Sequence, residues 1–358
     1  MDFNFPRVDY LLIDLIASCN LNCIHCRASD FDKKSFLDFK LIKKILNEAK
    51  KLGVKTITFS GGEPFLRKDI FDLISLAKGL GFIVRVQSNS LLLNDEKVKK
   101  LKELGLDYIG TGLDGLEENH DKMRSCKGAF RKVLENLNLF LKYGLKTHIE
   151  FTATNFNFLD FEEVMKICEE KGVYDVMTRI VLPAGKGKVF DFSLNKEQYR
   201  NFLKKVIEVK NGKINIKTYC QDPISIYLDK EHKKFLLKKY KNKKIIGGCS
   251  AGINMLYISP SGLVKPCSFL EVFFGNIKDK SLNEIFSSKE RELFLSKQLF
   301  RNFNKKCKSC KLKFLCGGCR ARAFNFNKDV WSEDPFCFKK KTGKKNLLLK
   351  EIKNTAEI

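Results

Sequence analysis

Residues 17–30 read Ala17-Ser-Cys-Asn-Leu-Asn-Cys-Ile-His-Cys-Arg-Ala-Ser-Asp30, and the rest of the chain is interpreted from them. Cys19, Cys23 and Cys26 follow the apolar run 10–16 with C-x3-C-x2-C spacing. Thiolates are soft ligands, and so short a loop suits neighbouring corners of an iron–sulfur cube. Three ligands for four irons leave one iron open. Structural thiols, or a zinc site completed by His25, are the alternatives, although His25 stands too close to its neighbours for easy tetrahedral closure.

This spacing resembles the signature of the radical S-adenosylmethionine (SAM) enzymes. In that family the open iron chelates the amino and carboxylate groups of SAM, and an electron passed through the cluster cleaves SAM to a 5′-deoxyadenosyl radical. The family usually has an aromatic residue where this chain has His25. The resemblance implies a radical SAM enzyme with a [4Fe-4S] cluster on Cys19, Cys23 and Cys26. It also implies SAM as a cofactor and a ferredoxin- or flavodoxin-like electron donor.

The composition favours a soluble, cytoplasmic protein. Its 358 residues are 44% hydrophobic and 30% charged. No apolar run approaches the ~20 residues of a membrane span, and no signal peptide precedes the first strand. Thirteen cysteines in such a chain argue for metal rather than disulfides. The net charge of +25 is spread along the chain, which predicts a solvated lysine-rich surface, disfavours a nucleic-acid partner and weakly favours an anionic substrate.

Residues 8–183 alternate apolar strands with amphipathic helices. Strands are expected at 9–16, 54–60, 82–88, 106–113, 145–154 and 174–182, and helices at 38–52, 69–80, 94–104, 127–143 and 159–171. A glycine stands between each helix and the next strand, where a left-handed cap is expected. The pattern predicts an α/β fold with a parallel sheet. The resemblance implies that this sheet curls into a partial (β/α)6 TIM-like barrel. Catalysis in such barrels takes place at the C-terminal ends of the strands.

Polar motifs end the next strands. Strand two ends Thr58-Phe-Ser-Gly-Gly-Glu-Pro64, where the glycines allow close backbone approach to a ligand and Glu63 can accept a bond from an ammonium. A plain strand-to-helix connection is the alternative. In strand four Gly112 replaces the serine common in the family, so a hydroxyl contact to SAM is missing or comes from Thr111. The SAM contacts that the resemblance implies are Gly61, Gly62, Glu63, Pro64, Ser88 and Asn89.

Charged residues further along are candidates for catalysis or substrate binding. Arg124 can pair with a carboxylate of SAM or substrate, or form a surface salt bridge. Glu150, Thr152 and Thr154 share one face of strand five by alternation. Two further candidates for contact with a substrate carboxylate are Arg179 and, in a flexible basic turn at 183–187, Lys186.

Seven cysteines in the last third resemble the SPASM extension of many radical SAM maturases. The resemblance implies two auxiliary [4Fe-4S] clusters, an outer one on Cys307, Cys310, Cys316 and Cys337 and an inner one on Cys249, Cys267 and Cys319. The fourth inner ligand is either Cys220 or an open position for substrate. Paired zinc knuckles are the alternative. Arg320 and Arg322, directly after Cys319, are candidates to raise the cluster potentials.

The expected organisation is a core barrel at 1–190, a helical bridge at 191–245 with a β-like run at 214–219, a SPASM domain at 246–340 with a hairpin at 256–264, and a basic tail at 341–358. The residues in and around the cysteine motifs most resemble those of the branch that acts on tetrapyrroles. This branch contains the haem d1 and alternative haem enzymes, which remove propionate or acetate side chains. We expect oxidative modification of a tetrapyrrole-like or other cofactor precursor. The alternatives are a peptide maturase, disfavoured because the chain has no room for an N-terminal leader-binding domain, and an iron–sulfur electron carrier without SAM turnover.

Overall fold

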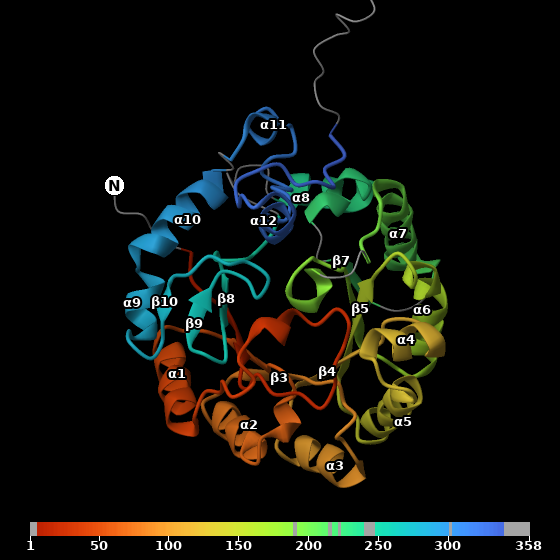
Figure 1. The fold of residues 1–358 in the computed structure, drawn as a ribbon, viewed down its shortest axis with the longest axis vertical. Coiled ribbons are helices and arrows are strands. Elements are labelled where there is room, and N and C mark those ends of the chain that lie inside the picture. Colours follow the sequence, from red (N-terminus) through yellow and green to blue (C-terminus); the bar gives the residue numbers. More distant parts are fainter. Residues whose placement is uncertain are drawn as a thin grey trace, which may run out of the picture.

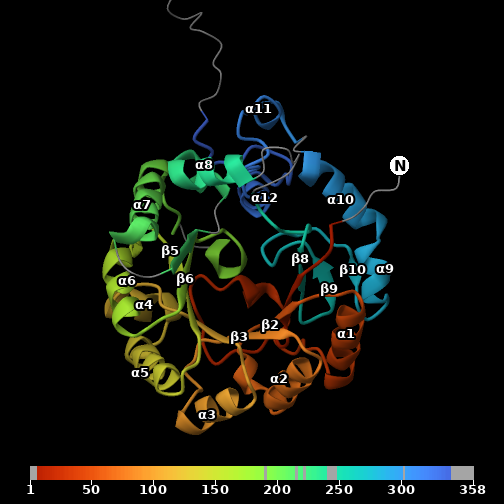
Figure 2. The same ribbon diagram turned by 180° about the vertical axis from the view of Figure 1, so that it is seen from behind.

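A computed structural model describes residues 6–188, 192–213, 217–220, 223–239, 248–300 and 303–339. Its centre is a ten-stranded sheet with the order β10-β9-β8-β1-β2-β3-β4-β5-β6-β7. Strands β1 to β7 are parallel, and helices cover their outer side (Figures 1 and 2). The sheet has two free ends, β10 and β7, so the barrel is partial. This confirms the expected α/β fold.

The six expected strands and five expected helices are present, and each is shorter than predicted by a residue or more at one or both ends. The strands are β1 Tyr10–Asp14, β2 Thr56–Ser60, β3 Ile83–Gln87, β4 Tyr108–Gly112, β5 Thr147–Ala153 and β6 Asp175–Ile180. The helices are α1 Phe39–Lys51, α2 Ile70–Gly79, α3 Asp95–Glu103, α5 Ala129–Lys142 and α6 Phe161–Glu170. The glycines between helix and strand have φ of 59° to 82°, as predicted for caps. Helix α4 Glu117–Arg124 is additional, and its one apolar residue, Met123, gave no periodic signal.

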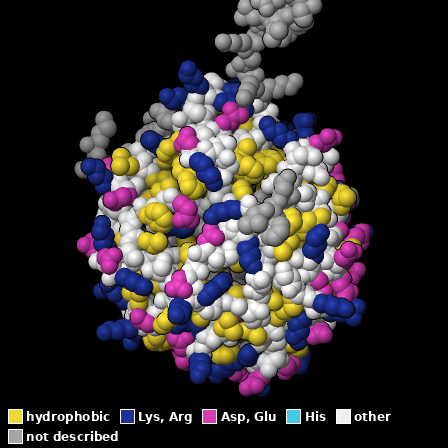
Figure 3. Space-filling model, in the orientation of Figure 1, with side chains coloured by type: hydrophobic (Ala, Val, Ile, Leu, Met, Phe, Trp, Pro, Cys, Tyr) yellow, Lys and Arg dark blue, Asp and Glu magenta, His cyan; other side chains and the backbone are white. Residues whose placement is uncertain are grey.

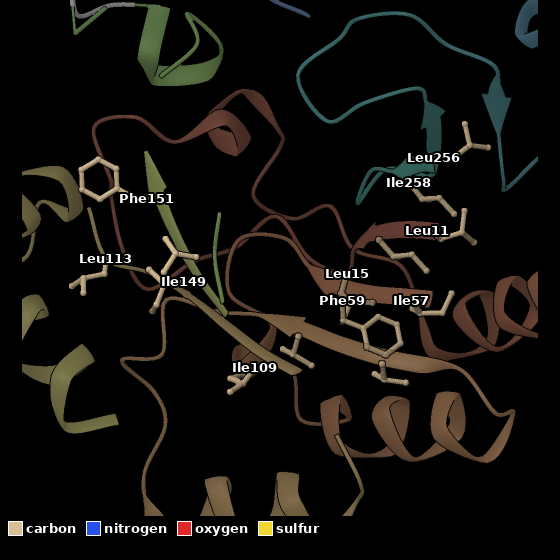
Figure 4. Packing of buried hydrophobic residues seen from close by; sticks show 14 of the residues in the cluster. Leu11, Leu15, Ile57, Phe59, Ile109, Leu113, Ile149, Phe151, Leu256 and Ile258 are labelled. Atoms are coloured by element: carbon tan, nitrogen blue, oxygen red, sulfur yellow. The ribbon is translucent and has the colours of Figure 1, made fainter. Parts of the chain in front are cut away.

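Alternation along the strands separates an apolar outer face from a polar inner face. Leu11, Ile57, Phe59 and Ile149 are fully buried in the core between the sheet and the helices (Figure 4). Residues at the intervening positions, such as Thr58, point the other way and line the interior of the barrel. Every second residue of each strand therefore points into the barrel, where its side chain can contact a ligand.

The C-terminal third extends the same sheet. Strand β8 Met255–Ile258 pairs in parallel with β1, and β9 Leu263–Lys265 returns antiparallel, followed by β10 Gly275–Asn276. Leu256 and Ile258 lie beside Leu11 in the core (Figure 4). The expected hairpin is thus present, and the expected β-like run is β7 Lys217–Cys220 at the opposite edge. The remaining helices are α7 Lys196–Glu208, α8 Lys230–Lys239, α9 Leu282–Phe286, α10 Lys289–Phe300, α11 Lys305–Lys308 and α12 Arg320–Asn327.

Arg291 ties this C-terminal part to the start of the chain. Its side chain is buried, and it donates hydrogen bonds of 2.6 to 3.2 Å to the backbone oxygens of Pro6, Gly252, Ile253 and Phe286. Burial lowers the pKa of Arg291 to about 10, so the guanidinium stays charged at neutral pH. One cation therefore satisfies four carbonyl groups from three segments.

We expect Arg291→Ala to lower the free energy of unfolding by about 3 kcal/mol, because several buried carbonyls lose their donor. The measurement is denaturant unfolding followed by circular dichroism. Arg131→Ala is the control: its guanidinium is 74% exposed beside Glu117, and its loss should cost less than about 1 kcal/mol. Equal stability of the two variants would show that the Arg291 clamp is dispensable.

Positive side chains are distributed over the face seen in Figure 3, with acidic side chains among them. This agrees with the expected solvated lysine-rich surface. In the described ranges, no helix combines the length and the apolar character that crossing a membrane would require.

Candidate active site

The first cysteine loop lies at the C-terminal end of β1 and opens on a large cavity. Cys19, Cys23 and Cys26 all line this cavity, whose volume is about 540 Å³. Burial raises the pKa of the Cys19 thiol to about 11, and the neighbouring Cys23 and Cys26 contribute to the rise. The three thiols are therefore close together and face one space.

Two turns hold the backbone of this loop. The N–H of Gly62 donates to the Ile16 oxygen at 2.7 Å, and a Cβ at position 62 would overlap the Ser18 carbonyl. Gly185, with φ of 57°, brings a second turn against Cys26. Both glycines thus allow a close approach to protein backbone, and Gly62 also lines the cavity.

The basic turn predicted at 183–187 packs against the first cysteine loop and supports it. The backbone N–H of Lys186 donates to the Cys26 oxygen at 3.1 Å, and its ammonium donates to Asn22. Lys186 does not line the cavity. Its side chain helps to fix the loop, and its contact with a substrate carboxylate stays a prediction.

Glu63 holds the end of β3. Its carboxylate is fully buried and accepts hydrogen bonds of 2.8 to 3.0 Å from the Phe65 N–H, the Ser88 hydroxyl and the Asn89 N–H. These bonds use both oxygens, and neither Glu63 nor Pro64 lines the cavity. A carboxylate can accept about four hydrogen bonds, so the contact of Glu63 with the SAM ammonium stays a prediction.

The other four predicted SAM contacts, Gly61, Gly62, Ser88 and Asn89, do line the cavity. The Asn89 amide donates to Asn20 at 2.8 Å and lies 3.7 Å from the Cys19 sulfur. The end of β3 is thus connected directly to the first cysteine loop.

Gly112 leaves room for Arg124. A Cβ at position 112 would overlap the Arg124 guanidinium, which pairs with the buried Asp114 and hydrogen-bonds the Cys23 sulfur. Arg124 therefore forms a buried salt bridge rather than the surface one considered from the sequence. Its guanidinium lines the cavity and its Nε has no partner among the described residues, so the contact with a carboxylate of SAM or substrate stays a prediction. Thr111 is fully buried on the opposite face of β4 and does not line the cavity, so it cannot supply the hydroxyl contact to SAM.

Glu150 and Arg179, on neighbouring strands, form an ion pair inside the cavity. Thr152 also lines it, whereas Thr154 lies beyond the end of β5 and is fully buried. Two of the three residues predicted for this face are thus confirmed there. Burial lowers the pKa of Arg179 to about 10, and the nearby Arg27 adds to the effect, but the guanidinium remains charged at neutral pH.

A buried polar triad that sequence reasoning missed links the first cysteine loop to β8. Arg27 donates to both oxygens of Asp14 at 2.9 and 3.0 Å, and the Tyr257 hydroxyl donates to Asp14 at 2.7 Å. The Arg27 guanidinium also lies 5.9 Å from the ring centroid of Phe269. The available signal was an aspartate inside the apolar run of β1, because a buried carboxylate requires a partner.

The four cysteines predicted for the outer cluster line one second, small cavity: Cys307, Cys310, Cys316 and Cys337. Arg320 lines it too and is buried, yet its Nε and Nη2 have no partner among the described residues. The Tyr227 hydroxyl lies 3.0 Å from the Cys310 sulfur. Buried N–H groups without acceptors are rare, and cluster sulfides would accept them. The residues therefore fit an iron–sulfur cluster.

The inner site adjoins the main cavity through Cys267. Burial raises the pKa of the Cys267 thiol, and Cys319 contributes to the rise, so these two lie close together. Cys220 ends β7, but its side chain, like residues 240–247, lies outside the described part of the chain. The choice between Cys220 and an open position remains a prediction.

Backbone N–H groups point at six of the ten expected ligand sulfurs, at distances of 3.3 to 3.5 Å. These sulfurs belong to Cys19, Cys249, Cys267, Cys310, Cys316 and Cys319. Cys126 instead donates its S–H to the Lys127 oxygen. Hydrogen bonds to sulfur stabilise thiolate ligands of iron–sulfur clusters. In the described ranges no three His, Cys, Asp or Glu side chains converge on one ion, but cubane ligands bind separate irons and need not converge.

Two family models match the chain. The radical SAM superfamily model matches residues 13–170. The SPASM model, an iron–sulfur cluster-binding domain, matches residues 249–311. The first range contains the cysteine loop at 19–26, and the second begins at Cys249.

Several known proteins resemble the chain over most of its length. The AdoMet-dependent heme synthase of Methanosarcina barkeri, where AdoMet denotes SAM, is 29% identical over 342 residues, covering 93% of this chain and 97% of the relative. The Fe-coproporphyrin III synthase of the same organism is 29% identical, covering 94% and 90%. Streptococcus suis SuiB, solved bound to SAM, has a TM-score of 0.74 at 20% identity, covering 93% of this chain and 77% of that chain. This last likeness is one of fold alone.

Proposed function

Because the chain is a radical SAM enzyme that carries a SPASM domain, we propose that it oxidatively trims a carboxylate side chain of a tetrapyrrole. The observation that carries the proposal is one cavity reaching from the first cysteine loop to Cys267. Its volume of about 540 Å³ lies in the range of pockets for cofactor-sized ligands. Two similar proteins are named as synthases of heme and of Fe-coproporphyrin III, which supports the substrate class.

Cys19, Cys23 and Cys26 would hold the [4Fe-4S] cluster that binds SAM, and SAM would lie against the cavity wall beside them, which is lined by Gly61, Gly62, Ser88 and Asn89. When bound, the clusters supply the electron that cleaves SAM and accept the electron that oxidative trimming releases. We assign Arg179 to the reacting carboxylate, since its five-donor fork is only partly used by Glu150.

The chain's own residues keep the reaction space defined. The Arg124–Asp114 pair and the Arg27–Asp14 pair close the walls on either side of the cysteine loop. The aspartates that pair with these two arginines are fully buried, whereas the Glu150 side chain that pairs with Arg179 is 17% exposed, which favours Arg179 as the contact for the substrate carboxylate. Ten cysteines used as cluster ligands need a reducing compartment, so the proposal places the enzyme in the cytoplasm with a ferredoxin- or flavodoxin-like donor.

The test is anaerobic reconstitution with iron and sulfide, followed by incubation with SAM, dithionite and a porphyrin tetrapropionate, free or with iron bound. We expect 5′-deoxyadenosine together with a porphyrin that has lost side-chain carboxylate, detected by mass spectrometry. 5′-Deoxyadenosine with unchanged porphyrins, combined with modification of a peptide, would support a maturase instead. Absence of 5′-deoxyadenosine under all conditions would support an electron carrier.

Arg320 gives a prediction for the outer cluster. Arg320→Gln removes a cation whose two unpartnered N–H groups face the four-cysteine cavity. A cation stabilises the more negative, reduced form, so we expect the outer-cluster potential to fall by about 60 mV, the one-electron equivalent of a charged hydrogen bond of ~1.4 kcal/mol. The measurement is a redox titration followed by electron paramagnetic resonance.

Lys311→Gln is the matched control for this titration. Lys311 follows Cys310 directly and carries the same charge, but it is exposed and does not line the cavity. Water screens it, so its loss should shift the potential much less. Equal shifts of the outer-cluster potential in the two variants would mean that Arg320 acts only by adding a positive charge to the protein, and not through its position at the cluster.

A further inference from the structure

The cavity continues below the level of the predicted SAM contacts. Arg85 lies on β3, three residues before Ser88, and faces the cavity. It is in register with Thr58 on β2 and Tyr108 on β4, both of which also line the cavity. Three residues of strand correspond to about 10 Å, so Arg85 marks a second level of the barrel interior.

Arg85 differs from the other arginines of the cavity because it has no acidic partner among the described residues. Arg27 pairs with Asp14, Arg124 with Asp114 and Arg179 with Glu150. Within the described ranges, Arg85 has neither an ion pair nor a side-chain hydrogen bond. Its guanidinium lies 4.3 Å from the ring centroid of Tyr108.

The acidic residues nearest in the sheet are already committed elsewhere. Asp107, which precedes Tyr108, accepts from the Lys78 ammonium at 2.6 Å and from the Val84 N–H at 2.8 Å. Asp175, at the start of β6, pairs with His148. These two neighbouring carboxylates are therefore not available to neutralise Arg85.

A partly buried guanidinium without an anion is costly to keep, and the planar Arg fork matches a carboxylate with two hydrogen bonds. Stacking on Tyr108 fixes the plane of that fork before a ligand arrives. We propose that Arg85 is a substrate-binding residue that anchors a second carboxylate of the substrate, about 10 Å deeper in the barrel than the predicted SAM contact Ser88. The polycarboxylate nature of the substrate is taken from the proposed function, while the position of the anchor comes from Arg85.

The test is equilibrium binding of a metal-free porphyrin tetrapropionate to the reconstituted enzyme without SAM, followed by porphyrin fluorescence. We expect Arg85→Gln to weaken binding about 10- to 100-fold, the range for one charged, bidentate contact. Arg85→Lys should recover part of the loss. The tetramethyl ester of the same porphyrin should bind the wild type and Arg85→Gln equally, because it presents no carboxylate.

Arg131→Gln, on the exposed face of α5, is the control and should bind like the wild type. Circular dichroism of each variant establishes that it is folded. If the wild type binds the tetracarboxylate and Arg85→Gln binds it equally well, the anchor is wrong and the proposed substrate stands. An equal loss of ester binding in Arg85→Gln would show a merely structural role. If the wild type binds no porphyrin carboxylate, the proposed substrate and the anchor both fail.

Discussion

Cys23→Ala is expected to abolish formation of 5′-deoxyadenosine. Cys23 is the central cysteine of the first loop, faces the cavity and is hydrogen-bonded by the buried Arg124. Removing it leaves two protein ligands for a four-iron cluster. The iron content of the reconstituted protein should fall from about twelve to about eight per chain, because each of three cubanes holds four irons. The measurements are iron analysis and chromatographic detection of the nucleoside.

Cys126→Ala is the matched control. Cys126 is also a free cysteine of the N-terminal half, but its S–H donates to the Lys127 oxygen and it does not line the cavity. This variant should keep the iron content and the activity of the wild type. Retention of the twelve-iron state in Cys23→Ala, or its loss in Cys126→Ala, would contradict the assignment of the first cluster to Cys19, Cys23 and Cys26.

Asp114→Ala is expected to destabilise the fold by about 3–5 kcal/mol, because it leaves the buried Arg124 without its counter-charge. Burial opposes ionisation of Asp114, yet the Arg124 charge lowers the pKa of Asp114, so the carboxylate is ionised. Its second oxygen accepts the Thr152 N–H at 2.8 Å. The loss is measured by denaturant unfolding of protein without bound clusters, so that cluster loss does not contribute.

Asp114→Asn separates the loss of the negative charge from the loss of the hydrogen bond with the Thr152 N–H. The amide oxygen can still accept the Thr152 N–H, so the remaining loss reports the missing charge. Glu117→Ala is the control, since Glu117 pairs with Arg131 on the surface and its loss should cost less than about 1 kcal/mol. A cost for Asp114→Ala as small as that of Glu117→Ala would show that Arg124 finds another partner.

The strand order and the cysteine sites could be predicted from the sequence because their signals are local. Glycines such as Gly53 and Gly81 end a helix and precede an apolar run, which places each strand within a few residues. The cysteine spacings depend only on which atoms one loop can bring together, so Cys19, Cys23 and Cys26 share a cavity as expected. Period-two alternation correctly placed Glu150 and Thr152 on the inner face of β5.

The partners of charged side chains could not be predicted, because they come from distant segments. Arg124 is 12 residues beyond Gly112 in the sequence, yet it fills the space that the missing side chain leaves. Glu63 is used by the end of β3, and Lys186 by the first cysteine loop. A motif names the residue type, but the fold decides whether its charge remains available to a ligand.

The pairing of β8 with β1 determines how this chain can be divided. A fragment ending before Met255 would expose the backbone groups of β1 along that edge and uncover Leu11. An unprotected apolar edge strand is a template for self-association, so such a fragment would aggregate instead of working as a free-standing SAM-cleaving module. Exchange of the C-terminal part between related enzymes during evolution would therefore have to bring along a replacement strand for β1.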